Sequence, residues 1–401
     1  MLRSLGVCLF SLALATSAGA AARCQNTGNF NTWLGDFKKE ALASGISKAT
    51  LAAAEPLLNF DQKTIDRDSP QGVFNQTFLQ FSDRMVNKFR MSKGASLIKQ
   101  NKALFDKIEA QFGVQAPVIV AFWALESDFG ADTGKLPILR SLTTLAYDCR
   151  RPDMFREQLM AALKIVDRGD LQVSEMIGSW AGELGATQFV PKHYVNFGVD
   201  FDGDGRVDLV HSTPDTLATT ANYLKSLGWK PGQPWIETVQ VPDEMPWEQS
   251  DLKIQLPRSQ WAKYGVTAAG GKALPADDMK ASLLLPMGRK GPAFLAYENF
   301  QAYLEWNQSF VYSTSAAYLA SRIGGGPALN RGNGEVTPLS ADAVKDLQRM
   351  LAKRGFDVGD IDGKIGSGTR AAVKETQLKL KLPADGYPDA ALIDKLRGAG
   401  G

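Results

Sequence analysis

Histidine and cysteine are scarce in this sequence, with 2 His and 3 Cys among 401 residues. So few histidines leave little room for a His-based metal centre or a His-dependent catalytic triad. Three cysteines exclude a disulfide-dense scaffold and a four-cysteine zinc site. An excess of one charge is lacking as well, since 45 Lys plus Arg and 43 Asp plus Glu give a net charge of +2. A general nucleic-acid binder carries a clear basic excess, so no nucleic-acid partner is predicted.

Long apolar runs are also lacking, and the run near the N-terminus is short. Arg3 precedes an apolar stretch from Leu5 to Ala15, and Ala18-Gly-Ala20 follows as a small-residue cleavage site. This order is typical of a secretory signal peptide, which we assign to residues 1–22. A buried N-terminal helix is the alternative. No later run reaches the ~18 apolar residues of a spanning helix, so no membrane span is predicted.

The cysteines that remain after export are two in number. Cleavage of the signal peptide removes Cys8 and leaves Cys24 and Cys149. An oxidising compartment favours a disulfide between them, and two free buried thiols are the alternative. Lipid attachment requires a small residue directly before the cysteine, but Arg23 precedes Cys24. The sequence therefore predicts no lipid anchor.

The rest of the composition is that of a globular protein, with 44% hydrophobic and 22% charged residues. A length of 401 residues, at roughly 150 residues per domain, predicts two or three domains. Apolar residues recur at three- and four-residue steps through most of 29–228, which predicts a mainly helical region. Particular helices are expected at 118–129, 154–166, 216–227 and 300–323.

Two stretches depart from the helical pattern. Residues 236–241 and 281–285 read as strands among many Pro and Gly, so a β-containing insert is expected at about 232–298 of a main domain spanning 23–325. A Gly-rich and Pro-containing linker follows at 326–338. Residues 339–401 then form a small helical unit, near the lower size limit for independent folding.

Glu126 is the first candidate for chemistry. It lies near the end of the predicted helix 118–129, with Phe122, Trp123 and Phe129 at helical spacing. Desolvation by aromatic side chains and the negative end of a helix dipole both favour a protonated carboxyl group. A carboxylic acid that stays neutral near pH 7 suits general-acid catalysis. A solvated position on the helix surface is the alternative.

The stretch from Gly178 to Pro191 is the second candidate. Its many small residues either let a ligand approach the backbone or allow tight packing between segments. Ser179 and Gln188 add hydrogen-bonding groups. The sequence does not decide between the two interpretations.

The acidic segment Asp200 to Asp208 is the third candidate. Oxygen-bearing residues stand at positions 1, 3, 5 and 9 and glycine at position 6, as in most of an EF-hand loop, but position 12 is His211. Asp215 is a candidate for the missing carboxylate. A structural metal is predicted, with calcium favoured by the hard oxygen ligands, and an acidic turn without metal is the alternative. The ligands expected are Asp200, Asp202, Asp204, Arg206, Asp208 and Asp215.

Several of these motifs, taken in order, resemble one known family. Ala-Leu-Glu126-Ser-Asp-Phe-Gly and Gly-Ser-Trp-Ala-Gly-x-Leu-Gly-x-x-Gln188-Phe-x-Pro are similar to motifs of the membrane-bound lytic transglycosylase B family, which cleaves peptidoglycan. The resemblance continues through Cys149-Arg-Arg151, the acidic segment, 221–229 and 307–312. It implies a lysozyme-like helical catalytic domain at 23–325 and a periplasmic location.

The resemblance also implies roles for particular residues. It makes Glu126 the single catalytic acid/base that cleaves the β-1,4 MurNAc-GlcNAc bond and forms 1,6-anhydro-MurNAc ends, with no catalytic cofactor. It implies a metal in the acidic loop. Residues implied to bind the glycan strand are Arg150, Arg151, Ser179, Gln188, Asn307 and Tyr312.

Other carboxylates bear on the mechanism. Hydrolytic glycosidases use two carboxylates, whereas a ring-closing transglycosylase needs no water and one acid/base. Asp128 stands two residues after Glu126 and is expected on another helix face. Glu183 departs from the family by placing an acid in the second motif, where it either tunes Glu126 or faces solvent. A hydrolytic muramidase and a non-catalytic peptidoglycan-binding scaffold are the alternative functions.

The terminal unit resembles a three-helix peptidoglycan-binding domain. The similarity rests on 344–351, Gly355, 362–366, 369–373 and Gln377, with departures at Ser367 and Thr376. A module that only packs against the catalytic domain is the alternative. Peptidoglycan glycan strands are the expected partner, and proteins of cell-wall synthesis or division are candidate partners.

Overall fold

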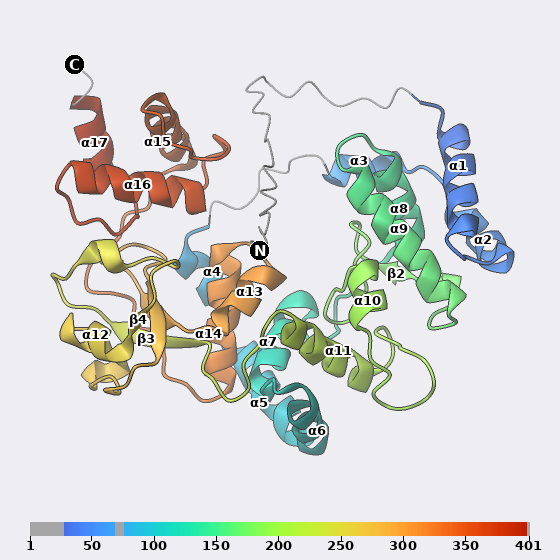
Figure 1. Ribbon diagram of the computed structural model, residues 1–401, viewed down its shortest axis with the longest axis horizontal. Coiled ribbons are helices and arrows are strands. Elements are labelled where there is room, and N and C mark those ends of the chain that lie inside the picture. The colour runs from blue at the N-terminus through green and yellow to red at the C-terminus, as the bar shows by residue number, and fades with distance from the viewer. Residues whose placement is uncertain (1–27, 69–75, 399–401) are drawn as a thin grey trace, which may run out of the picture.

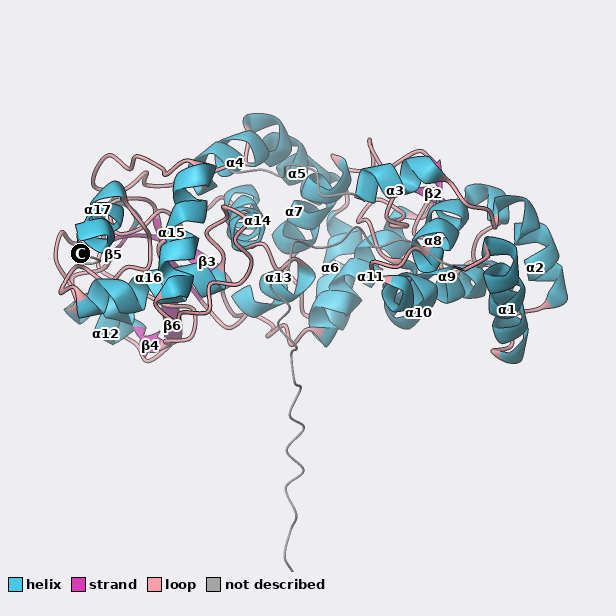
Figure 2. Cartoon of the chain, turned by 90° about the horizontal axis from the view of Figure 1, so that it is seen from above, coloured by secondary structure: helices cyan, strands magenta, loops and turns pink. Residues whose placement is uncertain are grey.

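The computed structural model describes residues 28–68 and 76–398, and these are mainly helical, as expected (Figures 1 and 2). The predicted signal peptide and Cys24 lie outside the described residues. Within the described part of the chain, no single helix is long and apolar enough to cross a membrane. One bent pair of helices, Lys102–Phe112 and Ala116–Ser127, passes the same test by length and composition.

The first helical group packs around the buried faces of two helices, α8 (Ile138–Tyr147) and α9 (Pro152–Asp167). Leu139, Leu142, Leu159 and Leu163 are fully buried there, together with Phe37 from the first helix. Asn29 and Ser47 cap helix N-termini with their side-chain oxygens. The elements are α1 Phe30–Ala43, α2 Lys48–Ala54, η1 Glu55–Leu57, α3 Gln62–Asp68, β1 Leu136–Pro137, α8 Ile138–Tyr147, α9 Pro152–Asp167, η2 Val173–Glu175, β2 Ile177–Gly178 and α10 Pro191–Phe197.

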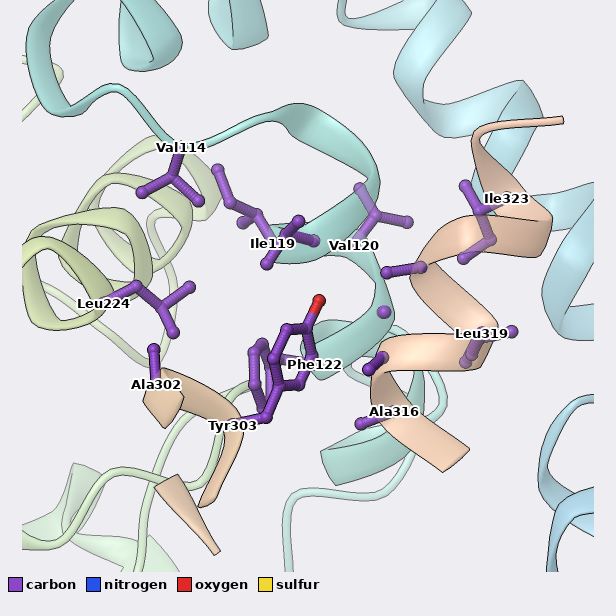
Figure 3. Close-up of a cluster of buried hydrophobic side chains, with 14 of the residues drawn as sticks. Val114, Ile119, Val120, Phe122, Leu224, Ala302, Tyr303, Ala316, Leu319 and Ile323 are labelled. Atoms are coloured by element: carbon purple, nitrogen blue, oxygen red, sulfur yellow. The ribbon is translucent and has the colours of Figure 1, made fainter. Parts of the chain in front are cut away.

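The second helical group surrounds α7, Ala116–Ser127, in which ten of 12 residues are buried. A helix that is apolar all round belongs inside a protein. Figure 3 shows its Ile119, Val120 and Phe122 among side chains of α11, α13 and α14. The surrounding elements are α4 Phe78–Met85, α5 Lys88–Gln100, α6 Lys102–Phe112, α11 Thr213–Ser226, α13 Phe300–Trp306 and α14 Phe310–Ile323.

The helix predicted over 300–323 is wrong in one respect, because the chain breaks between α13 and α14. At the break, the Asn307 side chain accepts the Ser309 N–H at 2.9 Å, and the Ser309 hydroxyl accepts the Tyr312 N–H at 3.3 Å. Short polar side chains compete in this way with the helical hydrogen bonds. The apolar periodicity continues on both sides, so it could not reveal the break.

The β-containing insert is confirmed as a five-stranded sheet in the order β4-β6-β7-β3-β5, with every pair antiparallel. The predicted strands 236–241 and 281–285 are β3 and β6 to within one residue. Asn299 holds the two ends of the insert together by accepting the Lys230 N–H at 2.6 Å and donating to the Gln233 carbonyl at 3.0 Å. The elements are β3 Ile236–Gln240, η3 Trp247–Gln249, β4 Leu256–Pro257, α12 Arg258–Lys263, β5 Thr267–Ala268, η4 Ala269–Gly271, β6 Lys280–Leu284 and β7 Ala293–Ala296.

The terminal unit has three helices and its own core, as expected. They are α15 Ala341–Lys353, α16 Ser367–Lys379 and α17 Ala390–Gly398. This unit contacts the insert through α16 and the turn before α17 (red beside yellow in Figure 1). The preceding segment is also anchored, because Arg331 contacts Asp83 of α4 through two nitrogens at 3.0 Å each.

Candidate active site

Glu126 lies in the last turn of α7 and is largely buried while keeping some exposed surface. The other residues of α7 except Pro117 are buried, so the Glu126 carboxyl group has mainly buried neighbours on its own helix. The position is the one expected from the sequence. Partial negative charge at a helix C-terminus disfavours an ionised carboxylate there.

Two donors meet the same oxygen of Glu126. The indole N–H of Trp306, the last residue of α13, donates to Oε1 at 3.0 Å. The hydroxyl of Tyr312, in the first turn of α14, also donates to Oε1. The break between α13 and α14 therefore brings one donor from each side to the acid.

The pKa of Glu126 is raised from 4.5 to about 7, mainly because burial disfavours the charged form. The hydrogen bonds from Tyr312 and Trp306 favour the carboxylate and lower the pKa, while the nearby charge of Glu183 raises it. A group that titrates near pH 7 exists in both protonation states under ordinary conditions. It is therefore suited to give and take one proton.

The chain turns sharply after Glu126. Asp128 and Phe129 have φ values of 50° and 63°, in the left-handed region that costs non-glycine residues about 1–2 kcal/mol each. The Phe129 N–H donates to the Trp123 carbonyl at 3.1 Å, which closes the helix end. Asp128 points to Arg90 of α5, with Oδ1 and Nε 2.7 Å apart. The expectation that Asp128 faces away from Glu126 agrees with this contact.

Ser127 ties the acid to the second motif. Its hydroxyl donates to the Ala186 carbonyl at 2.5 Å and accepts the Gly130 N–H at 2.8 Å. Sequence reasoning singled out Glu126 and missed its neighbour. The signal was present, since a hydroxyl residue follows the acid directly, but its partner lies 59 residues along the chain.

The second motif forms a compact loop beside the acid. A Cβ on Gly178 would lie 1.9 Å from the Glu183 carbonyl oxygen, and one on Gly185 would lie 2.2 Å from that of Leu209. These contacts favour the tight-packing interpretation of the small residues. Gln188 donates to the Thr133 and Gly185 carbonyls at 3.2 and 2.9 Å, so its side chain fixes the loop.

Ser179 and Glu183 form a pair within this loop. The Ser179 hydroxyl donates to Glu183 Oε2 at 3.0 Å and accepts the N–H groups of Ala181 and Glu183 at 3.2 Å each. Burial raises the pKa of Glu183, and the Ser179 hydrogen bond opposes the rise. Of the two roles left open for Glu183, the electrostatic effect on Glu126 is the one the structure favours.

The arginine pair is held by a carboxylate other than Glu126. In the described part of the chain, Arg150 and Arg151 both contact the buried carboxylate of Asp68, at the end of α3. The Arg151 guanidinium also lies 5.0 Å from the Phe155 ring centre. The two side chains remain 40% and 43% exposed, so both still reach solvent.

The acidic loop brings together part of the predicted ligand set. Carboxylate oxygens of Asp200, Asp202 and Asp204 lie within 4.8 Å of one another on the surface. Asp208 and Asp215 do not join them. Asp215 instead accepts backbone N–H groups of Phe201, Asp202 and Asp208, and Asp208 accepts those of Val210 and His211. These backbone N–H groups satisfy the two buried carboxylates and thereby fix the shape of the loop.

The Arg206 side chain is not the group that the predicted ligand set would use, so its place in that set stays a prediction. Its guanidinium contacts Asp204 Oδ2 at 3.2 Å, while position 7 of an EF-hand loop supplies a backbone carbonyl. Cys149 is disulfide-bonded. Its expected partner, Cys24, lies outside the described residues, so the pairing stays a prediction.

Comparison with known proteins connects this site to a family. Residues 29–321 match the family described as Transglycosylase SLT domain, and residues 340–396 match the family described as Putative peptidoglycan binding domain. The chain belongs to the Transglycosylase SLT family. It is an enzyme of the lytic transglycosylase type, as the sequence motifs indicated.

Three relatives extend this assignment. Membrane-bound lytic murein transglycosylase B of Escherichia coli K12 is 26% identical over 290 residues, 72% of this chain and 78% of that protein. SltB3 from Pseudomonas aeruginosa, solved in complex with NAG-anhNAM-pentapeptide, is 40% identical with a TM-score of 0.84, covering 92% of this chain and 99% of that one. The lytic transglycosylase Slt35 of Escherichia coli, solved in complex with calcium, is 23% identical with a TM-score of 0.61, covering 73% and 92%.

The transglycosylase family assignment confirms the expected fold class. The structural likeness to SltB3 spans the lysozyme-like helical region, the β-containing insert and the terminal helices, since it covers 92% of the chain. Among the described side chains, Glu126 with its donors Trp306 and Tyr312 is the strongest candidate for acid/base chemistry, because its pKa lies near 7 and two hydrogen bonds hold its carboxyl group.

Proposed function

We propose that the chain cleaves the β-1,4 MurNAc-GlcNAc bond of peptidoglycan without water and leaves 1,6-anhydro-MurNAc ends, with Glu126 as the single acid/base. The observation that carries the proposal is the Glu126 carboxyl group itself, largely buried and with its pKa raised to about 7. SltB3, 40% identical to this chain, was solved with both NAG-NAM-pentapeptide and NAG-anhNAM-pentapeptide, which supports this substrate and product chemistry.

The hydrogen bonds at Glu126 support one position for its proton. Oε1 accepts from both Trp306 and Tyr312. A carboxyl oxygen that accepts two hydrogen bonds is the carbonyl-like one, so the acidic proton resides on Oε2. Oε2 is therefore the atom that we expect to face the glycosidic oxygen.

The reaction then needs one carboxyl group. Glu126 Oε2 donates its proton to the glycosidic oxygen as the bond from C1 of MurNAc breaks. The resulting carboxylate is stabilised by the two donors on Oε1. It takes the proton of the MurNAc 6-hydroxyl while that oxygen bonds to C1, which closes the anhydro ring and restores the acid. No water is consumed, and the proton count balances.

The substrate-contacting residues proposed are Arg150, Arg151, Ser179, Gln188, Asn307 and Tyr312. Tyr312 contacts the acid directly. Asn307 lies beside Trp306 at the helix break, where its carbonyl accepts the Ser313 hydroxyl at 2.6 Å. The exposed arginine pair carries positive charge that suits the carboxylates of peptide stems. Residues 23–325 then form the catalytic domain, and residues 339–401 hold it on the wall after a linker at 326–338.

A structural calcium ion is proposed for the acidic loop. The three carboxylates that cluster, Asp200, Asp202 and Asp204, are hard oxygen donors of the kind calcium prefers. The ion would offset the repulsion among these acids and hold the loop that precedes α11. Slt35, a relative in fold, was solved with calcium, which supports the choice of metal.

The test is digestion of purified sacculi in water enriched in ¹⁸O, followed by mass spectrometry. Wild type should release products one water lighter than hydrolysis products and without ¹⁸O, and Glu126→Gln should release none. Asp128→Asn is the matched control, because this neighbouring carboxylate is paired with Arg90 and its replacement should keep activity. Products carrying ¹⁸O that disappear with Glu183→Gln would instead make the enzyme a hydrolytic muramidase.

Export to the periplasm, without a lipid anchor, completes the proposal. It rests on the sequence features at residues 1–24 and on the location of the substrate. Fractionation of cells that make the native protein tests the location.

A further inference from the structure

We propose that Arg370, which belongs to the terminal unit, is a positioning residue for Glu126 and acts through Phe310 and Tyr312. The inference rests on the proposed role of Glu126 as the acid/base. It gives the terminal unit a part in catalysis in addition to holding the enzyme on its substrate.

The Arg370 guanidinium reaches from α16 into the catalytic domain. Its Nη2 donates to the Leu285 carbonyl at 2.6 Å, and its Nη1 donates to the Pro286 carbonyl at 3.4 Å. Its Cζ lies over the ring of Phe310, 5.4 Å from the ring centre. Arginine keeps its charge under these conditions, and a cation over an aromatic ring is attracted to it.

Phe310 is the first residue of α14, and Tyr312 follows in the same turn. The three residues before Phe310 form the break that separates α14 from α13. On its N-terminal side this turn is held by the Ser309 cap, whose hydroxyl accepts the Tyr312 N–H at 3.3 Å, and not by helical hydrogen bonds. Contact with Arg370 supplies an outside support at the point from which Tyr312 donates to Glu126.

The surrounding joint keeps Arg370 in place. Lys374, one turn further along α16, contacts Asp251 Oδ2 at 3.1 Å. The Arg289 N–H donates to Asp385 Oδ2 at 2.9 Å. Gly288 lies so close to the terminal unit that a Cβ there would be 2.8 Å from the Tyr387 Cβ. Such close approach fixes the orientation of the two parts, so the position of Arg370 is transmitted to Phe310.

Lys374 provides the control, because it lies in the same joint and its polar contacts are with Asp251 and the Ser250 carbonyl. Full-length Arg370→Met, Arg370→Lys and Lys374→Met are compared on soluble, uncross-linked peptidoglycan strands, for which wall binding is not limiting. Thermal unfolding of each variant reports on the joint and the fold.

Arg370→Met should lower kcat about 10- to 100-fold at nearly unchanged KM, because small displacements of catalytic groups have effects of this size. The alkaline limb of its pH profile should move to higher pH, since loss of the Tyr312 hydrogen bond raises the pKa of Glu126. Arg370→Lys should recover part of the rate. Lys374→Met should leave the rate and the profile close to wild type, because the Arg289 N–H bond to Asp385 and the close packing of Gly288 against Tyr387 still hold the joint.

Equal kinetics and pH profiles for Arg370→Met and Lys374→Met would overturn the proposal and leave Arg370 as a docking contact. A rate loss without a shift of the alkaline limb would also overturn it. Failure of this inference differs from failure of the proposed function, which fails only if wild type makes no anhydro products or if Glu126→Gln still makes them.

Discussion

The ring of Phe122 stacks on the indole of Trp306, with centres 4.1 Å apart and planes inclined by 27°. Phe122 precedes Glu126 by one turn on α7, so the helix that carries the acid also holds the donor in place. Phe189 of the second motif lies against the same indole at 5.5 Å. Trp306 therefore contacts both motifs, since it packs against Phe189 of the second motif and donates a hydrogen bond to Glu126 of the first.

Replacing Trp306 by Phe should keep the aromatic packing and remove the N–H donor. The pKa of Glu126 should rise, because the Trp306 hydrogen bond lowers it. A general acid works while protonated, so the alkaline limb of the kcat/KM profile should move to higher pH. At pH values below that limb, kcat/KM should fall roughly tenfold, because the carboxyl group is held less firmly in position. An unchanged limb would show that the indole does not act on the acid.

Replacing Glu183 by Gln should have the opposite sign. The charge of Glu183 raises the pKa of Glu126, whereas an amide oxygen still accepts the Ser179 hydroxyl. The alkaline limb should therefore move to lower pH, and anhydro products should persist. Opposite shifts for the Trp306 and Glu183 variants would exclude a general effect of mutation on the profile. A complete loss of turnover would contradict a tuning role for Glu183.

Glu126 should also make stability depend on pH. Its pKa is raised from 4.5 in the unfolded chain to about 7 in the fold, so the folded protein binds more protons across this window. Stability should then fall as pH rises through it, by roughly 3 kcal/mol in total. Glu126→Gln removes this contribution. It should unfold at higher denaturant than wild type at pH 8, and the difference should close below pH 4.5.

Calcium should stabilise the protein through the acidic loop. Adding excess calcium after chelator treatment should raise Tm, and a site filled at 100 times its Kd contributes about 2.7 kcal/mol. Asp200→Asn should lose most of this gain, whereas Asp342→Asn, at a residue whose side chain is 93% exposed on α15, should retain it. A Tm that calcium does not change would contradict the proposed site.

Local patterns in the sequence predicted some features well, since their causes are local. The position of Glu126 near the end of α7 and the strands β3 and β6 follow from apolar spacing and from turn residues close by, although α7 ends at Ser127, two residues before the predicted end at Phe129. The prediction that Glu126 is buried required only the aromatic residues near it in the sequence.

Other features depend on contacts between distant segments. Trp306 meets Glu126 across 180 residues, and no spacing rule marks it. Asp215 was expected as a ligand, but its partners are backbone N–H groups that only the folded loop brings together. The Asp68 contact with the arginine pair likewise joins segments 83 residues apart.

One regularity in the terminal unit was missed. Gln348 accepts the Gly363 N–H at 2.9 Å, and Gln377 accepts the Gly386 N–H at 2.8 Å. Each Gln belongs to a helix, and each Gly follows an Asp in a turn, so the same arrangement occurs twice. The unequal spacing between Gln and Gly hides this repeat from a search at a fixed period.

The hydrogen bonds of Asn299, which join the two ends of the insert, bear on how much the sequence of the insert can change. The Tyr297 N–H donates to the Trp235 carbonyl at 3.0 Å, and Asn299 joins the same two ends of the insert. The segment that leaves the helical part of the catalytic domain and the segment that returns to it therefore lie side by side. An excursion that begins and ends together can change in length or content while the entry to α13 stays where it is. The insert is thus a place where sequence variation can alter the outer surface while the end of α13, with its indole, is left undisturbed.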